Sequence, residues 1–153
     1  MKTDEAGPSE SGPSPWARRL GFGGLIPFVS LAAALWVVWP ADWPLVRAAL
    51  LGYGATIASF LGAIHWGLAM RDGPVQPVPS LLWGVVPSLL AWLALLLGPA
   101  PGLLLITVLL WACFAVDRVL YPRYQLQAWL PMRLRLTVVA SISCVAGAAA
   151  LLR

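Results

Sequence analysis

Five long apolar runs, separated by short polar connections, restrict the fold of this chain more than any other feature. They cover residues 20–39, 45–70, 80–97, 103–121 and 132–152. Each is close to the roughly 20 residues that a helix needs to cross a bilayer. Backbone groups in lipid must be hydrogen-bonded internally, which leaves helices or closed barrels. Because the runs lack the period-two alternation of barrel strands, we predict an all-α membrane protein with five transmembrane helices in a bundle.

The composition supports lipid rather than water as the surrounding solvent. Sixty per cent of the 153 residues are hydrophobic and only 10% are charged, and a soluble protein of this size could not bury so much apolar surface. The net charge of +4 is not concentrated in a basic run, so no nucleic-acid partner is expected. The expected partners are the lipid bilayer and a membrane protein, with the oligomeric state left open.

Proline and glycine mark the expected boundaries. Residues 1–15 are polar and rich in Pro, Gly and Ser, which predicts a disordered tail ahead of a five-helix domain at 16–153. The acidic start does not resemble a secretory signal, so a retained first helix is expected. Pro27 and Pro87 predict kinks inside the first and third segments, and residues 98–102 (GPAPG) predict a turn.

The second apolar segment is the expected centre of the bundle, because small residues line two of its faces. Small residues at a spacing of four let helix backbones approach closely in lipid. One such ridge consists of Ala55, Ser59, Ala63 and Gly67. A seam toward the other face contains Gly54, Ala58, Leu61 and His65. Internal packing of the ridge is favoured over a homodimer contact, since four other helices compete for it.

The basic residues predict the orientation. Five spans place most Lys and Arg residues on the side of the amino terminus: Lys2, Arg18, Arg19, Arg71, Arg118, Arg123, Arg133 and Arg135. Only Arg47 and Arg153 fall on the other side. Cytoplasmic loops carry the excess of Lys and Arg. We therefore expect a cytoplasmic amino terminus and a periplasmic carboxy terminus in a bacterial inner membrane.

Two short ionisable side chains inside the spans, His65 and Asp117, predict a polar cluster. Both lie at a similar depth, about one to one and a half turns from the cytoplasmic ends of their helices. An unpaired charge in the membrane is costly, so Asp117 is expected to pair with an arginine. The candidates are Arg118, Arg133 and Arg135. His65 is expected to hydrogen-bond to Asp117 or to a carbonyl.

The cluster has three interpretations. It can be a structural lock between helices, a proton relay that uses the histidine beside a carboxylate, or part of a catalytic site. No nucleophile partners His65, and neither HExxH nor a phosphate-binding loop is present. The two cysteines, Cys113 and Cys144, are expected to be buried and reduced. Neither a metal site nor a cofactor is expected.

The segments GLIPF, YGATIASFLGAIHWGLAM and LWGVVPSLLAWLALLL, followed by an Asp, YPRY and RLRLT, resemble one family of small multi-pass membrane proteins. It is the domain of unknown function 3429, or transmembrane protein 69-like, family. The resemblance covers about residues 20–145 and implies a five-helix bundle in a bacterial inner or a mitochondrial membrane. The family has no established activity, so it implies no catalytic residue.

These observations favour a non-enzymatic membrane protein that binds or assists a membrane partner. A proton-coupled transporter using His65 and Asp117 is the second hypothesis, and a lipid- or quinone-directed membrane enzyme is the third. A dry, packed interior would support the first hypothesis, and a water-filled cavity reaching His65 the second. A lateral opening lined by aromatic side chains, with His65 and Arg133 facing it, would support the third.

Overall fold

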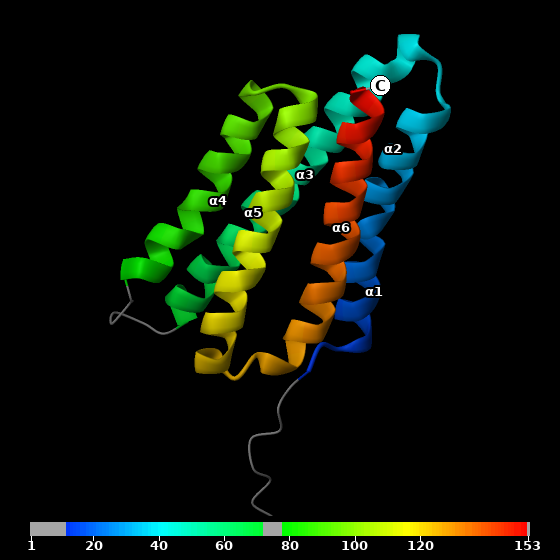
Figure 1. Ribbon diagram of the computed structural model, residues 1–153. Helices are drawn as coiled ribbons and strands as arrows, with labels where there is room; N and C mark the ends of the chain where they lie inside the picture. Colours follow the sequence, from blue (N-terminus) through cyan, green and yellow to red (C-terminus); the bar gives the residue numbers. More distant parts are fainter. Residues whose placement is uncertain (1–11, 72–77, 153) are drawn as a thin grey trace, which may run out of the picture.

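The computed structural model describes residues 12–71 and 78–152, and every regular element in these ranges is helical (Figure 1). The α-helices are α1 (Pro15–Gly23), α2 (Leu25–Val37), α3 (Trp43–Arg71), α4 (Val78–Leu96), α5 (Pro99–Leu120) and α6 (Leu130–Leu151). Short 3₁₀ helices connect them: η1 (Pro40–Asp42), η2 (Tyr121–Tyr124) and η3 (Gln127–Trp129). Residues 1–11 of the predicted tail lie outside the described residues.

The described helices form five stretches that are long and apolar enough to cross a membrane, which confirms the predicted architecture. The first stretch combines α1 and α2, and each of the others is built on one long helix. Large apolar side chains cover the outside of the bundle: Leu89 and Trp92 of α4 are exposed, as are Val108 of α5 and Ile142 of α6. Such a surface suits contact with lipid chains.

The first span is broken at Gly24, three residues before Pro27. Proline has no N–H to donate to the preceding turn, so nearby carbonyl groups lose their helical partners. The hydroxyl of Tyr53, on α3, donates to the Gly24 carbonyl at 2.7 Å. The short helix α1 buries none of its residues. It packs on α6, where Gly21 faces the end of Met132.

The second span, α3, packs against α2, α4, α5 and α6, so the central position predicted for it is supported. Its 29 residues correspond to about 44 Å of helix. That length exceeds a hydrocarbon core of roughly 30 Å, so a tilt is required. Figure 1 shows α3 running obliquely behind α5 and α6.

Pro99 and Pro101 lie within α5 rather than in the turn that precedes it. Pro99 occupies the first turn, where its missing N–H has no partner to lose. The turn is therefore shorter than the predicted 98–102 segment and depends on Gly98, whose φ is +86°. Pro87 lies fully buried inside α4, which continues through it without interruption.

The two ends of the bundle are named here by their 3₁₀ helices. The η1 end contains η1, the Gly98 turn and the end of α6, and the η2 end contains η2, η3 and the start of α1 (Figure 1). Four helices meet tightly near the η1 end at Gly147 of α6. A Cβ added there would lie 2.5 Å from Leu50 Cδ2, 3.4 Å from Leu103 Cδ1 and 3.5 Å from Leu35 Cδ1. Those three leucines are fully buried.

Candidate functional site

Three side chains from three helices meet in the interior near the η2 end. His65 lies on α3, Asp117 on α5 and Arg133 on α6, and each is less than a tenth exposed. The Arg133 guanidinium donates through Nε and Nη2 to Asp117 Oδ2, at 2.8 and 2.6 Å. His65 Nε2 lies 3.2 Å from the other carboxylate oxygen, Oδ1. The structure therefore places these three predicted residues together.

The histidine is held less firmly than the arginine. Although Nε2 is close to Asp117 Oδ1, neither ring nitrogen of His65 has a well-directed hydrogen bond within the described part of the chain. Hydrogen bonds weaken steeply when the donor does not point at the acceptor. The contact between His65 and Asp117 is thus electrostatic, and the Asp117–Arg133 contact carries the directed bonds.

The other two candidate arginines, Arg118 and Arg135, are exposed and lie outside this cluster. Helix geometry explains the difference. Successive residues of an α-helix point about 100° apart, so Arg118 faces away when its neighbour Asp117 faces the interior. Arg135 is two positions after Arg133 and points toward the opposite side of α6.

The Asp117–Arg133 pair joins α5 to α6 inside an apolar bundle. Removing one partner of a buried pair leaves an uncompensated charge, which typically costs about 3–5 kcal/mol. The pair therefore constrains how these two helices dock at the η2 end. His65 adds α3 to the same cluster through its contact with the carboxylate.

The small residues of α3 divide between the interior and the surface. In the predicted ridge, Ala55 is buried and Ser59 half-buried, whereas Ala63 and Gly67 are exposed. Every residue of the other seam is buried: Gly54, Ala58, Leu61, Gly62 and His65. The ridge winds out of the interior because a spacing of four residues drifts around a helix with 3.6 residues per turn.

The closest approach of α3 and α4 uses a glycine from each helix. A Cβ on Gly62 would lie 2.5 Å from the Gly84 carbonyl oxygen. A Cβ on Gly84 would collide with the indole ring of Trp66. That indole donates through Nε1 to the Leu81 carbonyl at 3.0 Å. These contacts position the His65 segment against α4.

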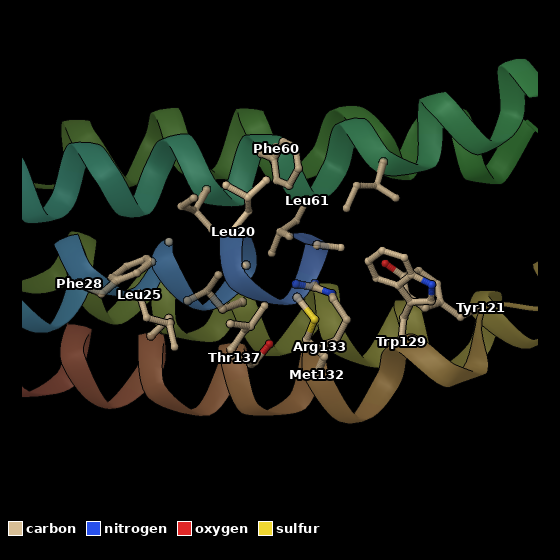
Figure 2. Close-up of a pocket in the computed structure, with 18 of the residues that line it drawn as sticks. Leu20, Leu25, Phe28, Phe60, Leu61, Tyr121, Trp129, Met132, Arg133 and Thr137 are labelled. Carbon is tan, nitrogen blue, oxygen red and sulfur yellow. The ribbon is translucent and has the colours of Figure 1, made fainter. Parts of the chain in front are cut away.

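A cavity of about 540 Å³ lies beside this cluster, between α1, α2, α3 and α6 (Figure 2). Most of its lining is apolar, with aromatic rings from Phe28, Phe60, Tyr121 and Trp129. At its edge, Leu20 is 73% and Phe60 62% exposed. The edge of the cavity is therefore bordered by exposed apolar side chains.

Arg133 and Thr137 provide polar groups in the lining, and Figure 2 shows both extending from α6. The cavity does not include His65 in its lining. The Ser59 hydroxyl donates back to the Ala55 carbonyl of its own helix at 2.9 Å, as helical Ser and Thr hydroxyls commonly do. The buried hydroxyl of Thr137, in contrast, has no partner in the described part of the chain. The four-residue spacing from Arg133 is the sequence signal that could have placed Thr137 in the site.

The described residues contain no cluster of three or more His, Cys, Asp or Glu side chains that could hold a metal ion. Cys113 and Cys144 are both buried free thiols. The available chemistry in this region is therefore hydrogen bonding and electrostatics around Arg133 and the hydroxyls of Thr137 and Tyr121.

Together, the fold and its apolar exterior define a helical multi-pass membrane protein. The chain belongs to the family described as Protein of unknown function (DUF3429), which it matches over residues 13–149. It is 41% identical to Transmembrane protein 69 of Xenopus tropicalis over 138 residues, which is 87% of this chain and 53% of that protein. It is 29% identical to Transmembrane protein 69 of Mus musculus over 125 residues, 80% of this chain and 51% of that protein. The chain thus spans about half the length of these relatives. No solved structure matches it.

Proposed function

We propose that this protein is a non-enzymatic membrane protein that binds a hydrophobic molecule of the bilayer in the cavity between α1, α2, α3 and α6. The observation that carries the proposal is the cavity itself: its volume of about 540 Å³ falls within the range of small-molecule sites. The exposed apolar side chains at its edge let a ligand enter from lipid without crossing water. A few polar groups in an apolar lining are also typical of sites that orient one ligand.

The arrangement of the ionisable groups favours binding over catalysis. Asp117 accepts both directed bonds from Arg133, so the carboxylate is engaged in holding α5 to α6. His65 is only 1% exposed and lies outside the cavity lining. A general acid or base must come within hydrogen-bond reach of its substrate, and a ligand in this cavity does not meet that histidine.

The same geometry weighs against the proton-coupled transporter. Such a carrier needs an aqueous route to its titrating group, whereas apolar side chains form most of the cavity next to the cluster. Of the hypotheses raised by the sequence, the geometry therefore favours a non-enzymatic binding role, with a component of the bilayer as the partner in place of a membrane protein.

We further propose that the η2 end faces the cytoplasm of a bacterial inner membrane, with the amino terminus cytoplasmic and the carboxy terminus periplasmic. Exposed Arg118, Arg123 and Arg135 lie at or near that end, as expected for the positively charged side of a membrane protein. Alkaline phosphatase fused after Arg153 should be active in bacteria and inactive when fused within residues 72–77. The reverse activities would contradict this orientation.

The binding proposal can be tested by photolabelling. The full-length protein, purified in detergent, is exposed to a long-chain alcohol carrying a diazirine, and the labelled peptides are mapped by mass spectrometry. We expect saturable labelling of the segments that line the cavity, with competition by excess unlabelled alcohol.

Two adjacent residues provide a matched pair of variants. Leu25 lines the cavity and is half-buried, whereas Ile26 is 67% exposed and outside the lining. Leu25→Trp should fill the cavity and reduce labelling, and Ile26→Trp should leave it unchanged. Uniform, non-saturable labelling that is equal in both variants would show that the cavity holds only bulk lipid or detergent.

A further inference from the structure

We propose that the occupant of the cavity is an uncharged amphiphile with a single tail, whose head carries carbonyl oxygens, the chemistry of a prenyl quinone. This inference rests on the proposed binding function and specifies its ligand. Three independent features of the cavity point to this chemistry: its charge balance, its unpartnered donor, and its size.

The charge balance excludes a strongly anionic head. Arg133 is the cationic side chain in the lining, and Asp117 already neutralises it through two bonds of 2.8 and 2.6 Å. An additional anion would therefore leave an uncompensated negative charge in an apolar site, which is unfavourable. The guanidinium also has a hydrogen bond with the Tyr121 hydroxyl. It carries five N–H donors in all, so a neutral carbonyl oxygen can accept from one that these bonds leave over.

Thr137 adds a second polar group on the same face of α6. It is 2% exposed, and its hydroxyl has no hydrogen-bond partner in the described part of the chain. Leaving a buried hydroxyl unpaired costs free energy that a ligand acceptor would recover. Four residues separate it from Arg133, so the two side chains lie about one turn, or roughly 6 Å, apart along α6. A head with separate acceptor oxygens can bond to both.

The size of the cavity suits a ring with a short length of tail. Such a group can occupy a volume of about 540 Å³. The rest of the tail would leave between Leu20 and Phe60 into the bilayer. The rings of Tyr121 and Trp129, both in the lining, offer aromatic surface to a flat head.

Competition for the diazirine-alcohol labelling tests the ligand class with the full-length protein in detergent. Decylubiquinone carries the proposed head, and decylbenzene has the same tail and a ring without carbonyls. We expect decylubiquinone to displace the probe at a concentration about tenfold lower than decylbenzene, as two neutral hydrogen bonds would produce. Dioleoylglycerol and dioleoyl phosphatidic acid should compete no better than decylbenzene.

A pair of hydroxyl variants shows whether the cavity-facing donor is responsible. Thr137→Val removes the hydroxyl while keeping the side-chain shape. Ser141→Ala removes another buried, unpartnered hydroxyl of α6 that lies outside the lining. Thr137→Val should weaken competition by decylubiquinone about two- to tenfold and leave decylbenzene unchanged. Ser141→Ala should change neither.

Any one of four results would overturn the inference. Equal competition by decylubiquinone and decylbenzene would show that the head groups are not recognised. Stronger competition by phosphatidic acid would indicate an anionic ligand, and stronger competition by dioleoylglycerol a two-tailed one. No effect of Thr137→Val would remove the hydroxyl from the site. In all four cases saturable cavity labelling would still support the broader binding function, whereas absence of such labelling would overturn both.

Discussion

The two ends of this bundle are built from the same helices but close in different ways. At the η1 end, Gly147 lets leucine side chains of α2, α3 and α5 converge on α6. At the η2 end, the Asp117–Arg133 pair joins α5 to α6, and a cavity lies beside it. In this bundle, close apolar packing thus characterises one end, and a directed ion pair beside a cavity characterises the other.

The largest expected effect comes from breaking that bond. Asp117→Ala leaves Arg133 buried without its partner, and we expect a loss of about 3–5 kcal/mol in the free energy of unfolding. Titration with a denaturing detergent, followed by circular dichroism, measures the loss. Arg118→Ala, at the adjacent exposed position, serves as the control and should behave as wild type.

A double variant sharpens this test. Replacing both members of a buried pair by apolar residues is often close to neutral. Asp117→Leu combined with Arg133→Met should therefore be more stable than Asp117→Leu alone. If the double variant is the less stable of the two, the pair does not act through charge compensation.

The next effect concerns packing at the η1 end. Gly147→Val places a branched side chain where Leu50, Leu103 and Leu35 already meet, and overpacking of this kind costs about 1–3 kcal/mol. The matched control is Gly67→Val on the exposed face of α3, where an added Cβ meets nothing within 4 Å. The same detergent titration compares them. Equal stability of both variants would contradict the tight packing described for the η1 end.

The smallest effect is expected at the cavity. Leu25→Trp adds volume to an existing space, so its free energy of unfolding should stay within about 1 kcal/mol of wild type, below the overpacking range. A larger loss would show that this end is packed as tightly as the η1 end. The result also checks that reduced photolabelling in this variant does not come from unfolding.

The sequence was sufficient for the architecture but not for every boundary. The apolar runs located all five spans, because hydrophobic length is a property of each segment by itself. The start of α5 was misplaced, since Pro99 could be read either as a turn residue or as the first turn of a helix. The break at Gly24 was anticipated near Pro27, but the bond from Tyr53 that accompanies it depends on a distant helix.

The site was only partly accessible to the same reasoning. Equal depth in the membrane was enough to predict that His65 and Asp117 lie close together. The cost of an unpaired charge in the membrane predicted an arginine beside Asp117. Depth does not define rotation about the helix axis, so it could not select Arg133 over the exposed Arg118 and Arg135. The cavity was not foreseen, because it depends on how several helices are arranged, which no single segment encodes.

The break at Gly24 has a consequence for how this protein can vary. One wall of the cavity, α1, buries none of its residues, whereas the α2 side of the break supplies the core residues Phe28, Ala32 and Leu35. Substitutions at the exposed positions of α1 can thus change the entrance with little effect on stability, whereas a Cβ added at Gly21 would lie 2.2 Å from Met132 Cε. The part of this span that borders the cavity is therefore separate from the part that supplies its buried core.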